Sequence, residues 1–486
     1  MITSRSNRPT LPLARALGST LVFGALALGT ACNSTPFQAP TPEPEGEAAK
    51  FYAVNPIRDL DLIFMIDNSG SMKEEQAKLR KNFPVFINTL RAIPGGLPNV
   101  HIGIVSSDVG AGNVFISGNP ACNRPGGDKG EFQAKAGCGL DGTGNFIISL
   151  NNDTMKNFTG KLEDVFSCMA DLGTGGCGFE HQLQSVRVAL AENVTPKNAG
   201  FLRPDAFLAV VLITDEDDCS GQPTSDLYAD ASFEGQTGSL RCNVAGHLCN
   251  GMAPPNMEFQ TPLVNCTSNP KGRLIPVNDM TQFILGLKKN FPERIIVSAI
   301  TGLPNKADGT QYAFRKSADA NAGGQVLDIE PVCSAGADGT AAPSIRVSEF
   351  VKAFGANGTL DSICNDDFSP ALKRIAELIA ARLDPGCISE KLIDTDSKTA
   401  GVQAECSVID RVPNTTSGGF DDKVLPACGK GAAPCWQLQA PGAMGNSCAA
   451  PQFRVAVDRA GKEAPKGTIQ AVKCRTCALA DDKRCM

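Results

Sequence analysis

The chain is poor in histidine and has no surplus of positive charge. Only three of its 486 residues are histidine, and 45 Lys and Arg stand against 51 Asp and Glu, for a net charge of −6. So few histidines disfavour a histidine-based zinc site or a Ser–His–Asp triad. Nucleic-acid-binding proteins need a basic face, and an anionic lipid surface is an equally poor partner for an acidic chain. We therefore predict that the chain binds no nucleic acid.

The sequence also lacks common nucleotide-binding and hydrolase motifs. It contains no Walker phosphate loop, no dinucleotide glycine fingerprint and no serine nucleophile elbow. No apolar run approaches the roughly 18 residues that a transmembrane helix needs. Hydrophobic residues make up 42% and charged residues 20% of the chain, which is near the average of globular proteins. A chain of this composition and length is expected to fold into two or three units, or into one large domain with insertions.

Cysteine, in contrast, is abundant, and the N-terminus indicates why. Nineteen cysteines are unusual in a cytosolic enzyme but common in exported proteins, where disulfides persist. Residues 1–31 combine three arginines, a short apolar run at 21–28 and small residues before Cys32, which is typical of a secretory signal. Small residues followed by cysteine resemble the lipobox of bacterial lipoproteins, which implies that Cys32 is acylated and becomes the first mature residue. Ordinary signal cleavage, with Cys32 in a disulfide, is the alternative.

The segment after Cys32 favours the lipoprotein interpretation. Residues 33–50 contain four prolines and three glutamates, a composition typical of an extended, solvated linker. We assign 32–57 to a tether and expect an exported protein that a lipid anchors in the bacterial cell envelope, at the outer membrane or its periplasmic face. Without Cys32 eighteen cysteines remain, an even number, and we predict that most or all of them are paired.

Strand and helix patterns alternate through the middle of the chain. Nearly continuous apolar runs predict buried strands, and apolar residues spaced by three or four predict helices. Such strands are typical of a parallel sheet covered by helices on both faces. The expected strands are 59–66, 100–106, 206–214 and 294–301, with a further one at 145–150, and the expected helices are 72–93, 160–171, 179–193, 278–290, 346–354 and 368–383.

These patterns predict an α/β domain at 58–387 with a doubly wound, mostly parallel sheet. Gly-, Asn- and Cys-containing stretches at about 107–160 and 219–275 are expected to be insertions. Pro84, inside the expected helix 72–93, predicts a kink or a break there.

The remaining residues, 388–486, have few long apolar stretches, the only Trp and seven cysteines. We predict a small β module held by disulfides. The pair Cys474 and Cys477 forms a CxxC motif, which we interpret as structural rather than redox-active.

Spacing alone suggests two local disulfides within the α/β domain. We predict Cys168–Cys177 and Cys122–Cys138, because each pair lies within one expected loop region.

Oxygen-bearing side chains follow two of the expected strands. Asp67, Ser69 and Ser71 lie where the first strand turns into a helix, and Asp215 ends the most apolar strand. Ligands of open α/β sheets bind beyond the carboxyl ends of the strands, and hard cations prefer oxygen ligands. These four side chains therefore predict a site for one Mg²⁺, or for Mn²⁺ or Ca²⁺. An ordinary helix N-cap at Asp67 is the alternative.

The segments DLIFMIDNSGSM (61–72) and VVLITDEDD (210–218) resemble the von Willebrand factor type A domain and its metal-ion-dependent adhesion site. The resemblance covers roughly residues 58–385 and implies a Rossmann-like fold. It further implies that the two serines contact the metal directly, that the aspartates complete or orient its shell, and that one coordination position is left for an acidic group on a partner.

The remaining ligand of that family is a threonine in a glycine-rich loop. The corresponding loop here is Gly173–Glu180, and Cys177 stands at the position of that threonine. Thr174 and Glu180 are the other candidates, and a thiol is a poor ligand for Mg²⁺.

Two classes of function follow. The favoured one is a non-enzymatic binding module, whose cation captures a carboxylate on a protein or glycan of the envelope or of the extracellular space. The alternative is a metal-dependent hydrolase that uses Asp217, Asp218 or Glu180 as base, and a structural component with a vestigial site is a third possibility. In the favoured hypothesis Asp217 and Asp218 form only a solvated acidic rim, and the three histidines are ordinary structural residues.

Overall fold

The computed structural model describes residues 45–53 and 58–477 apart from short stretches. These stretches are 94–95, 113, 117–118, 143, 192–195, 223, 255–261, 290, 305–310, 319–323, 335–339, 384–385, 389, 397, 415–418, 444–447, 449–451, 463 and 466–467. The expected signal sequence and Cys32 lie outside the described residues, so the predictions about them stay predictions.

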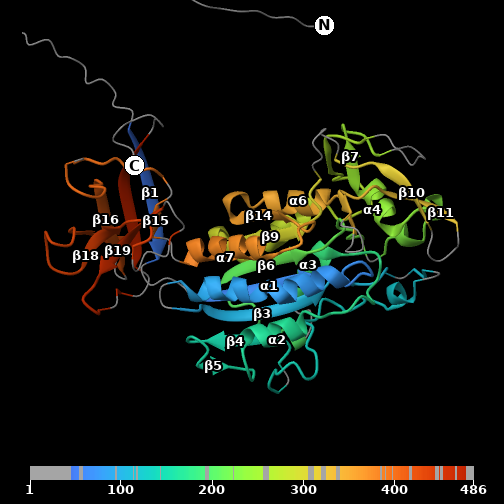
Figure 1. The fold of residues 1–486 in the computed structure, drawn as a ribbon, viewed down its shortest axis with the longest axis horizontal. Coiled ribbons are helices and arrows are strands. Elements are labelled where there is room, and N and C mark those ends of the chain that lie inside the picture. The colour runs from blue at the N-terminus through green and yellow to red at the C-terminus, as the bar shows by residue number, and fades with distance from the viewer. Residues whose placement is uncertain are drawn as a thin grey trace, which may run out of the picture. The chain divides into compact units, whose positions relative to one another are not determined.

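A mixed sheet forms the centre of the α/β domain (Figure 1). Its described strands are β2 (Asp59–Ile66), β3 (Asn99–Ser106), β4 (Ile147–Leu150), β5 (Met155–Lys156), β6 (Phe207–Ile213), β9 (Ile295–Thr301) and β14 (Gly358–Ser362). Their order is β14-β9-β6-β2-β3-β4-β5. The first five are mutually parallel, whereas β4 and β5 add antiparallel to the β3 side. The prediction of an α/β fold with a mostly parallel sheet is confirmed.

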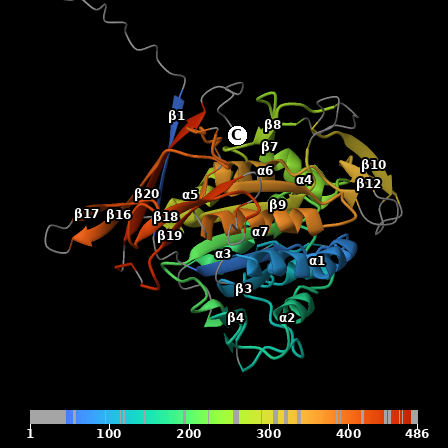
Figure 2. The ribbon, with the colours of Figure 1, turned by 60° about the vertical axis from the view of Figure 1, so that its left-hand side comes forward.

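Helices cover both faces of this sheet because successive side chains of its strands point to opposite sides. Leu62 and Phe64 of β2 pack in one core with α1 (Lys73–Arg91), α2 (Leu162–Met169) and α7 (Ser369–Leu383). Ile63 and Met65 pack in the other core with α3 (Gln182–Leu190), α5 (Val277–Leu287) and α6 (Ile345–Lys352). Helices α1 and α7 lie side by side on the first face (Figure 2).

Helix α1 runs through Pro84 without a break. Proline lacks the N–H that would bond to the carbonyl four residues earlier, which is that of Arg80. The hydroxyl of Ser167 on α2 donates to this carbonyl at 3.1 Å instead. The neighbouring Phe83 and Phe86 are fully buried against the sheet. The predicted break was wrong, since a partner on another helix satisfies the carbonyl.

The two expected insertions differ in structure. The stretch 107–160 contributes β4 and β5 to the main sheet. The stretch 219–275 forms α4 (Gly238–Gly246) and the hairpin of β7 (His247–Cys249) and β8 (Cys266–Ser268). It packs in one apolar cluster with a second hairpin, β10 (Phe314–Ala318) and β11 (Gln325–Ile329). This second hairpin, and the short pair β12 (Cys333–Ser334) and β13 (Thr340–Ala341) after it, were not predicted.

The C-terminal module consists of two antiparallel sheets in its described part. One has the order β1-β20-β16-β17 and the other β15-β19-β18. Their bounds are β1 (Glu45–Ala53), β15 (Cys387–Ile388), β16 (Cys406–Asn414), β17 (Gly419–Leu425), β18 (Cys435–Gln439), β19 (Phe453–Asp458) and β20 (Ile469–Cys477).

Strand β1 corrects the expected tether at 32–57. Its nine residues pair antiparallel with β20, from Glu45 opposite Cys477 to Ala53 opposite Ile469. Residues 45–53 contain no proline, and a proline-free segment can supply every backbone donor that a β-ladder needs. Residues 45–53 therefore belong to the C-terminal module.

All seventeen cysteines in the described part of the chain are disulfide-bonded. The pairs include Cys122–Cys177, Cys138–Cys168, Cys219–Cys242, Cys249–Cys266, Cys333–Cys364, Cys387–Cys448, Cys406–Cys474 and Cys428–Cys435. Because Cys474 bonds to Cys406, the CxxC motif does not form a disulfide within itself.

The two predicted local disulfides were wrong in their partners. Cys122 bonds to Cys177 rather than to Cys138, and Cys138 bonds to Cys168 rather than Cys168 to Cys177. Cys138 and Cys168 both lie at the core on the α1 side of the sheet, whereas Cys122 and Cys177 share a separate apolar cluster. Packing, which sequence separation does not reveal, selects the partners.

Candidate metal site

Three strands of the parallel sheet end at the same level, and the next residue of each is polar. In register, Ile66 of β2 lies opposite Ser106 of β3 and opposite Ile213 of β6. The residues that follow are Asp67, Ser107 and Thr214. This edge is where an open α/β sheet holds its ligands, and the three side chains meet there.

Asp67 is the centre of the site and is fully buried. Its Oδ1 accepts hydrogen bonds from the Ser69 amide at 2.8 Å and from the Ser107 hydroxyl at 3.0 Å, and its Oδ2 accepts one from the Thr214 hydroxyl at 2.7 Å. Burial raises the pKa of Asp67, and these hydrogen bonds oppose part of the increase. Gln182 donates in turn to Thr214 at 2.9 Å. The carboxylate is therefore held in one orientation.

The other predicted ligands lie around Asp67. The hydroxyl oxygens of Ser69 and Ser71 are 3.4 Å apart, and the Ser71 hydroxyl hydrogen-bonds to Asp215. Asp215 is 2% exposed, and its Oδ1 has no hydrogen-bond partner among the described residues. Burial and the charges of Asp67 and Glu216 raise the pKa of Asp215 well above its ordinary value. The structure thus brings together Asp67, Ser69, Ser71 and Asp215.

Two further carboxyl groups, Glu180 and Glu216, lie beside this cluster. Their side chains hydrogen-bond to each other. Burial, together with the charges of Glu216 and Asp67, raises the pKa of Glu180 well above its ordinary value. Burial also raises the pKa of Glu216, although a hydrogen bond from Ser239 opposes this. The sequence pattern did not single out Glu216, because an acidic run after a strand is usually solvated.

These four carboxyl groups have no cationic side chain to balance them. Among the described residues, none of these four side chains forms an ion pair with Lys, Arg or His. They belong to Asp67, Asp215, Glu180 and Glu216. Buried carboxylates ordinarily have such a partner or bind a metal. In the described part of the chain, no three His, Cys, Asp or Glu side chains are arranged to hold a metal by themselves. A cation at this edge would therefore depend on the serine hydroxyls as well.

The glycine-rich loop Gly173–Glu180 closes one side of the site. The Gly176 amide donates to the Asn68 carbonyl at 2.9 Å, and a Cβ at Gly176 would lie only 2.3 Å from the Asn68 side chain. Gln76 of α1 donates to the carbonyls of Asp67 and Gly173 at 2.8 and 2.9 Å. Glycine at 176 and the two Gln76 bonds hold the loop against the end of β2.

The loop also contains the three candidates for the remaining metal ligand, Cys177, Thr174 and Glu180. The Cys177 sulfur is bonded to Cys122, so it is not available to a metal. Thr174 is exposed, whereas Glu180 is buried next to Asp67. Of the three candidates, Glu180 is the one that interacts electrostatically with Asp67.

Asp217 and Asp218 correct the expectation of a solvated acidic rim, because both are buried. Asp217 accepts hydrogen bonds from three amides at the start of α6, including Ile345 at 2.9 Å, and it lies 2.7 Å from Nε2 of His247. Asp218 binds Arg346 at 2.9 Å. Burial acts to raise the pKa of Asp217, but His247 and Arg346 together lower it. These partners lie far away in the sequence, which is why an acidic run alone did not reveal them.

The three histidines have other contacts than the carboxylate cluster in the described structure. His247 pairs with Asp217, and Nδ1 of His101 lies 2.9 Å from the carbonyl of Phe201. Burial lowers the pKa of His181 to about 4, so this side chain is neutral at pH 7. The interpretation of the histidines as structural residues agrees with these positions.

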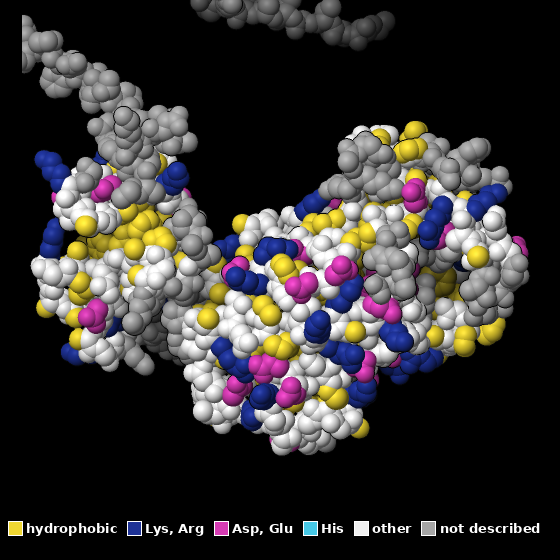
Figure 3. Space-filling model, in the orientation of Figure 1, with side chains coloured by type: hydrophobic (Ala, Val, Ile, Leu, Met, Phe, Trp, Pro, Cys, Tyr) yellow, Lys and Arg dark blue, Asp and Glu magenta, His cyan; other side chains and the backbone are white. Residues whose placement is uncertain are grey.

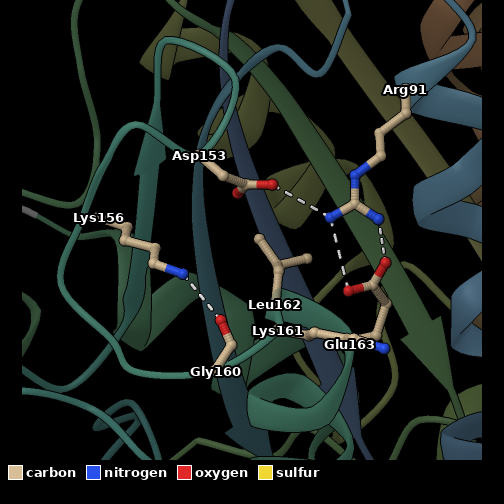
Figure 4. A pocket seen from close by; sticks show the side chains of 7 residues that line it. All are labelled: Arg91, Asp153, Lys156, Gly160, Lys161, Leu162 and Glu163. Carbon is tan, nitrogen blue, oxygen red and sulfur yellow. Dashed lines mark hydrogen bonds and ion pairs between the residues drawn. The ribbon is translucent and has the colours of Figure 1, made fainter.

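A hollow of about 480 Å³ lies near α2 and contains none of the predicted site residues (Figure 4). Arg91 there bonds to Asp153 at 3.1 Å and to Glu163, while Lys156 donates to the carbonyl of Gly160 at 2.8 Å. Its charges are thus largely satisfied by one another. On the face of the α/β domain in Figure 3, basic and acidic side chains are interspersed in the same way.

No known family model matches the chain, and no curated protein matches it. Similar solved structures include a von Willebrand factor type A protein from Catenulispora acidiphila, with 9% identity, a TM-score of 0.30 and coverage of 89% of this chain and 65% of that one. The pilus adhesin SpaC from Lactobacillus rhamnosus GG, in its open conformation, has 11% identity, a TM-score of 0.30 and coverage of 88% and 41%. The three N-terminal domains of the type V pili tip protein Mfa5 from Porphyromonas gingivalis have 11% identity, a TM-score of 0.22 and coverage of 89% and 68%.

The chain thus spans less than two thirds of the length of the first two structures. At such low identities and TM-scores, these likenesses carry no functional assignment.

Proposed function

We propose that the chain is a von Willebrand factor type A-like binding module, which uses a divalent cation to capture a carboxylate on a protein or glycan partner. The observation that carries the proposal is the cluster of Asp67, Asp215, Glu180 and Glu216, four carboxyl groups that form no ion pair with a cationic side chain in the described part of the chain. One bound Mg²⁺, Mn²⁺ or Ca²⁺ would supply the missing positive charge.

The residues present fit such an ion. Ser69, Ser71 and Asp215 offer oxygen ligands, of the kind that hard cations prefer. Asp67 is already bound by three donors, so its role is to orient the serine turn and to add negative charge. Neutral hydroxyl ligands leave the ion electrophilic, and an incoming partner carboxylate can complete its shell.

This arrangement favours binding over catalysis. The hydrolase alternative needs a base beside the ion, and Asp217 and Asp218 are engaged with α6, His247 and Arg346. Glu180 is the candidate that remains, and its side chain is buried and already hydrogen-bonded to Glu216. We therefore propose a non-enzymatic protein.

We place its partner in the cell envelope or in the extracellular space. The secretory signal and lipobox-like residues before Cys32 support export and an N-terminal lipid anchor. The disulfide bonding of the described cysteines supports an oxidising compartment. None of the described helices has the length and apolar character to cross a membrane.

Calorimetric titration with Mg²⁺, Mn²⁺ and Ca²⁺ tests the cation site. Wild type should bind one ion, and Asp215→Asn should lose binding by tenfold or more, since a charged ligand is replaced by a neutral one of the same shape. Asp171→Asn is the matched control, because Asp171 is a half-exposed carboxylate in ion pairs with Arg80 and Lys135. Equal affinities of Asp215→Asn and wild type would refute the site.

Capture from an envelope extract tests the partner. The chain should retain an envelope component in Mg²⁺ and release it when a chelator is added. Asp215→Asn should retain none in either condition. Retention that is insensitive to the chelator and to the substitution would contradict cation-dependent capture, even if the ion itself binds.

A further inference from the structure

The C-terminal module has an exposed sheet edge. Strand β17 (Gly419–Leu425) pairs with β16 on one side and is the outermost strand of its sheet in the described part of the chain. Six of its seven residues are exposed, including Phe420 at 44% and Val424 at 67%. Exposed edge strands can pair with another strand, and large apolar side chains on such an edge favour that pairing.

The register indicates which backbone groups of β17 face outward. Pro413 of β16 lies opposite Phe420, and proline has no N–H to donate. In an antiparallel ladder, directly opposed residues alternate between pairs that exchange hydrogen bonds and pairs that do not. The Pro413–Phe420 pair must belong to the second kind. The backbone N–H and C=O of Phe420, Asp422 and Val424 therefore point away from β16, toward the free edge.

The side chains of β17 are complementary to a second copy of the same strand. If two copies run antiparallel around an axis at Asp422, Phe420 of each lies opposite Val424 of the other. On the other face of the sheet, Asp421 lies opposite Lys423 twice. Apolar residues thus meet apolar ones and opposite charges meet, arrangements that stabilise cross-strand pairs.

The two Asp422 carboxylates would meet at the axis, but each already has a counter-charge. Arg411 of β16 binds Asp422 at 2.9 Å, and its guanidinium also lies over the Phe420 ring at 5.4 Å. The axis would therefore carry two Asp–Arg pairs rather than two bare carboxylates.

We propose that β17 pairs with β17 of a second copy of this chain, antiparallel and centred on Asp422, so that two C-terminal sheets join into one. This dimer is independent of the cation site. A contact of two seven-residue strands is small, and small interfaces form weak, transient complexes. The dimer is therefore expected to form at micromolar rather than nanomolar concentrations.

Cysteine cross-linking of the full chain tests the register. In the proposed pairing the two copies of residue 422 lie about 5.5 Å apart between Cα atoms, within disulfide range. The two copies of residue 421 are diagonal neighbours at about 7–8 Å, beyond that range. Under mild oxidation Asp422→Cys should give a covalent dimer, whereas Asp421→Cys and wild type should not. Cross-linking of Asp421→Cys as efficient as that of Asp422→Cys would overturn the proposal.

A charge exchange tests the side-chain complementarity. Sedimentation velocity should show that Asp421→Lys and Lys423→Asp each weaken dimerisation by ~10-fold or more, because each places like charges opposite one another twice. The double variant restores opposite charges and should dimerise like wild type. The proposal fails if wild type is monomeric at every concentration, or if all four chains associate equally. Monomers that bind another protein through β17 would also overturn it.

Discussion

Asp215 lies in an environment that compensates its charge poorly. Its Oδ1 has no hydrogen-bond partner in the described structure, and Asp67 and Glu216 add negative potential around it. A buried charged group without partners costs folding stability. Residues that destabilise the fold in this way are commonly retained because they serve a function. Replacing Asp215 is therefore expected to raise the stability of the metal-free protein and to remove cation binding.

In the absence of divalent cations, Asp215→Asn should be more stable than wild type by about 1–3 kcal/mol, since an unpaired buried carboxylate becomes a neutral amide. The measurement is urea unfolding in a chelator. The same variant should lose the stabilisation that Mg²⁺ gives to wild type. A variant that is less stable than wild type in chelator would show that Asp215 has a structural role instead.

The raised pKa values at this cluster also predict a pH dependence. Asp67, Asp215, Glu180 and Glu216 all have pKa values above the ordinary 3.8 or 4.5 of their side chains. Without metal the folded state binds more protons than the unfolded state, so their contribution to stability is full below about pH 4 and is lost as the pH rises through the raised values.

A bound cation should remove this loss, because it stabilises the carboxylates. The difference between the unfolding free energies in Mg²⁺ and in chelator should therefore increase from pH 5 to pH 8. Asp171→Asn, outside the cluster, should show the same increase as wild type. A pH-independent difference would argue against carboxylate ligation.

At the scale of elements, Asp217 joins β6 to α6. Three amides of the first turn of α6 donate to it, and His247 from the 219–275 insertion lies against it. A single side chain thus connects the central sheet, a covering helix and an inserted hairpin.

Asp217→Ala should destabilise the α/β domain by about 2–4 kcal/mol, because it removes a helix cap and leaves His247 without its buried partner. Denaturant unfolding measures the loss, and Glu234→Ala, at an exposed position, is the control. A loss below about 0.5 kcal/mol, as for an ordinary surface site, would restore the earlier interpretation of Asp217 as a solvated rim residue.

Elements with strong apolar periodicity could be predicted from the sequence, and elements stabilised by distant partners could not. The strand ending at Ile66 and the helix after it follow from their patterns. Strand β14 (Gly358–Ser362) was missed because it is a short edge strand with only one buried side chain. Strand β1 was missed because its partner β20 lies more than 400 residues later.

The residues of the candidate site likewise fall into some that could be predicted from the sequence and some that could not. The convergence of Asp67, Ser69, Ser71 and Asp215 at one edge of the sheet could be predicted, because the two segments that carry them come shortly after apolar strands. Glu216 and the burial of Asp217 could not, because only packing with α6 and the insertion removes that acidic run from solvent. Disulfide partners are likewise a property of packing.

For the molecule as a whole, disulfides attach loops to the domain. The Cys122–Cys177 bond connects the 107–160 stretch to the loop Gly173–Glu180 beside the site. Replacing both cysteines by alanine should cost about 2–4 kcal/mol of stability and weaken Mg²⁺ binding, because the loop loses one attachment. The pair Cys428–Cys435, in the C-terminal module, is the matched control and should leave Mg²⁺ affinity unchanged. Equal Mg²⁺ affinity in both double variants would contradict a role for this bond at the site.

The predicted lipid anchor at Cys32 is also tested on the whole protein. Mass spectrometry of the mature protein should find an N-terminal Cys32 carrying a lipid. An unmodified peptide that reads through residue 32 would refute the lipoprotein hypothesis.

The pairing of β1 with β20 has a mechanical consequence. Asp67 is reached from residue 45 through β1, the short connection after it and β2. Tension between the N-terminus and a partner held at the site would therefore run along the backbone of these two strands. The rest of the C-terminal module lies beside this path and is attached to it through the ladder between β1 and β20. Strand β2 would resist the load by shear against β3 and β6 on either side.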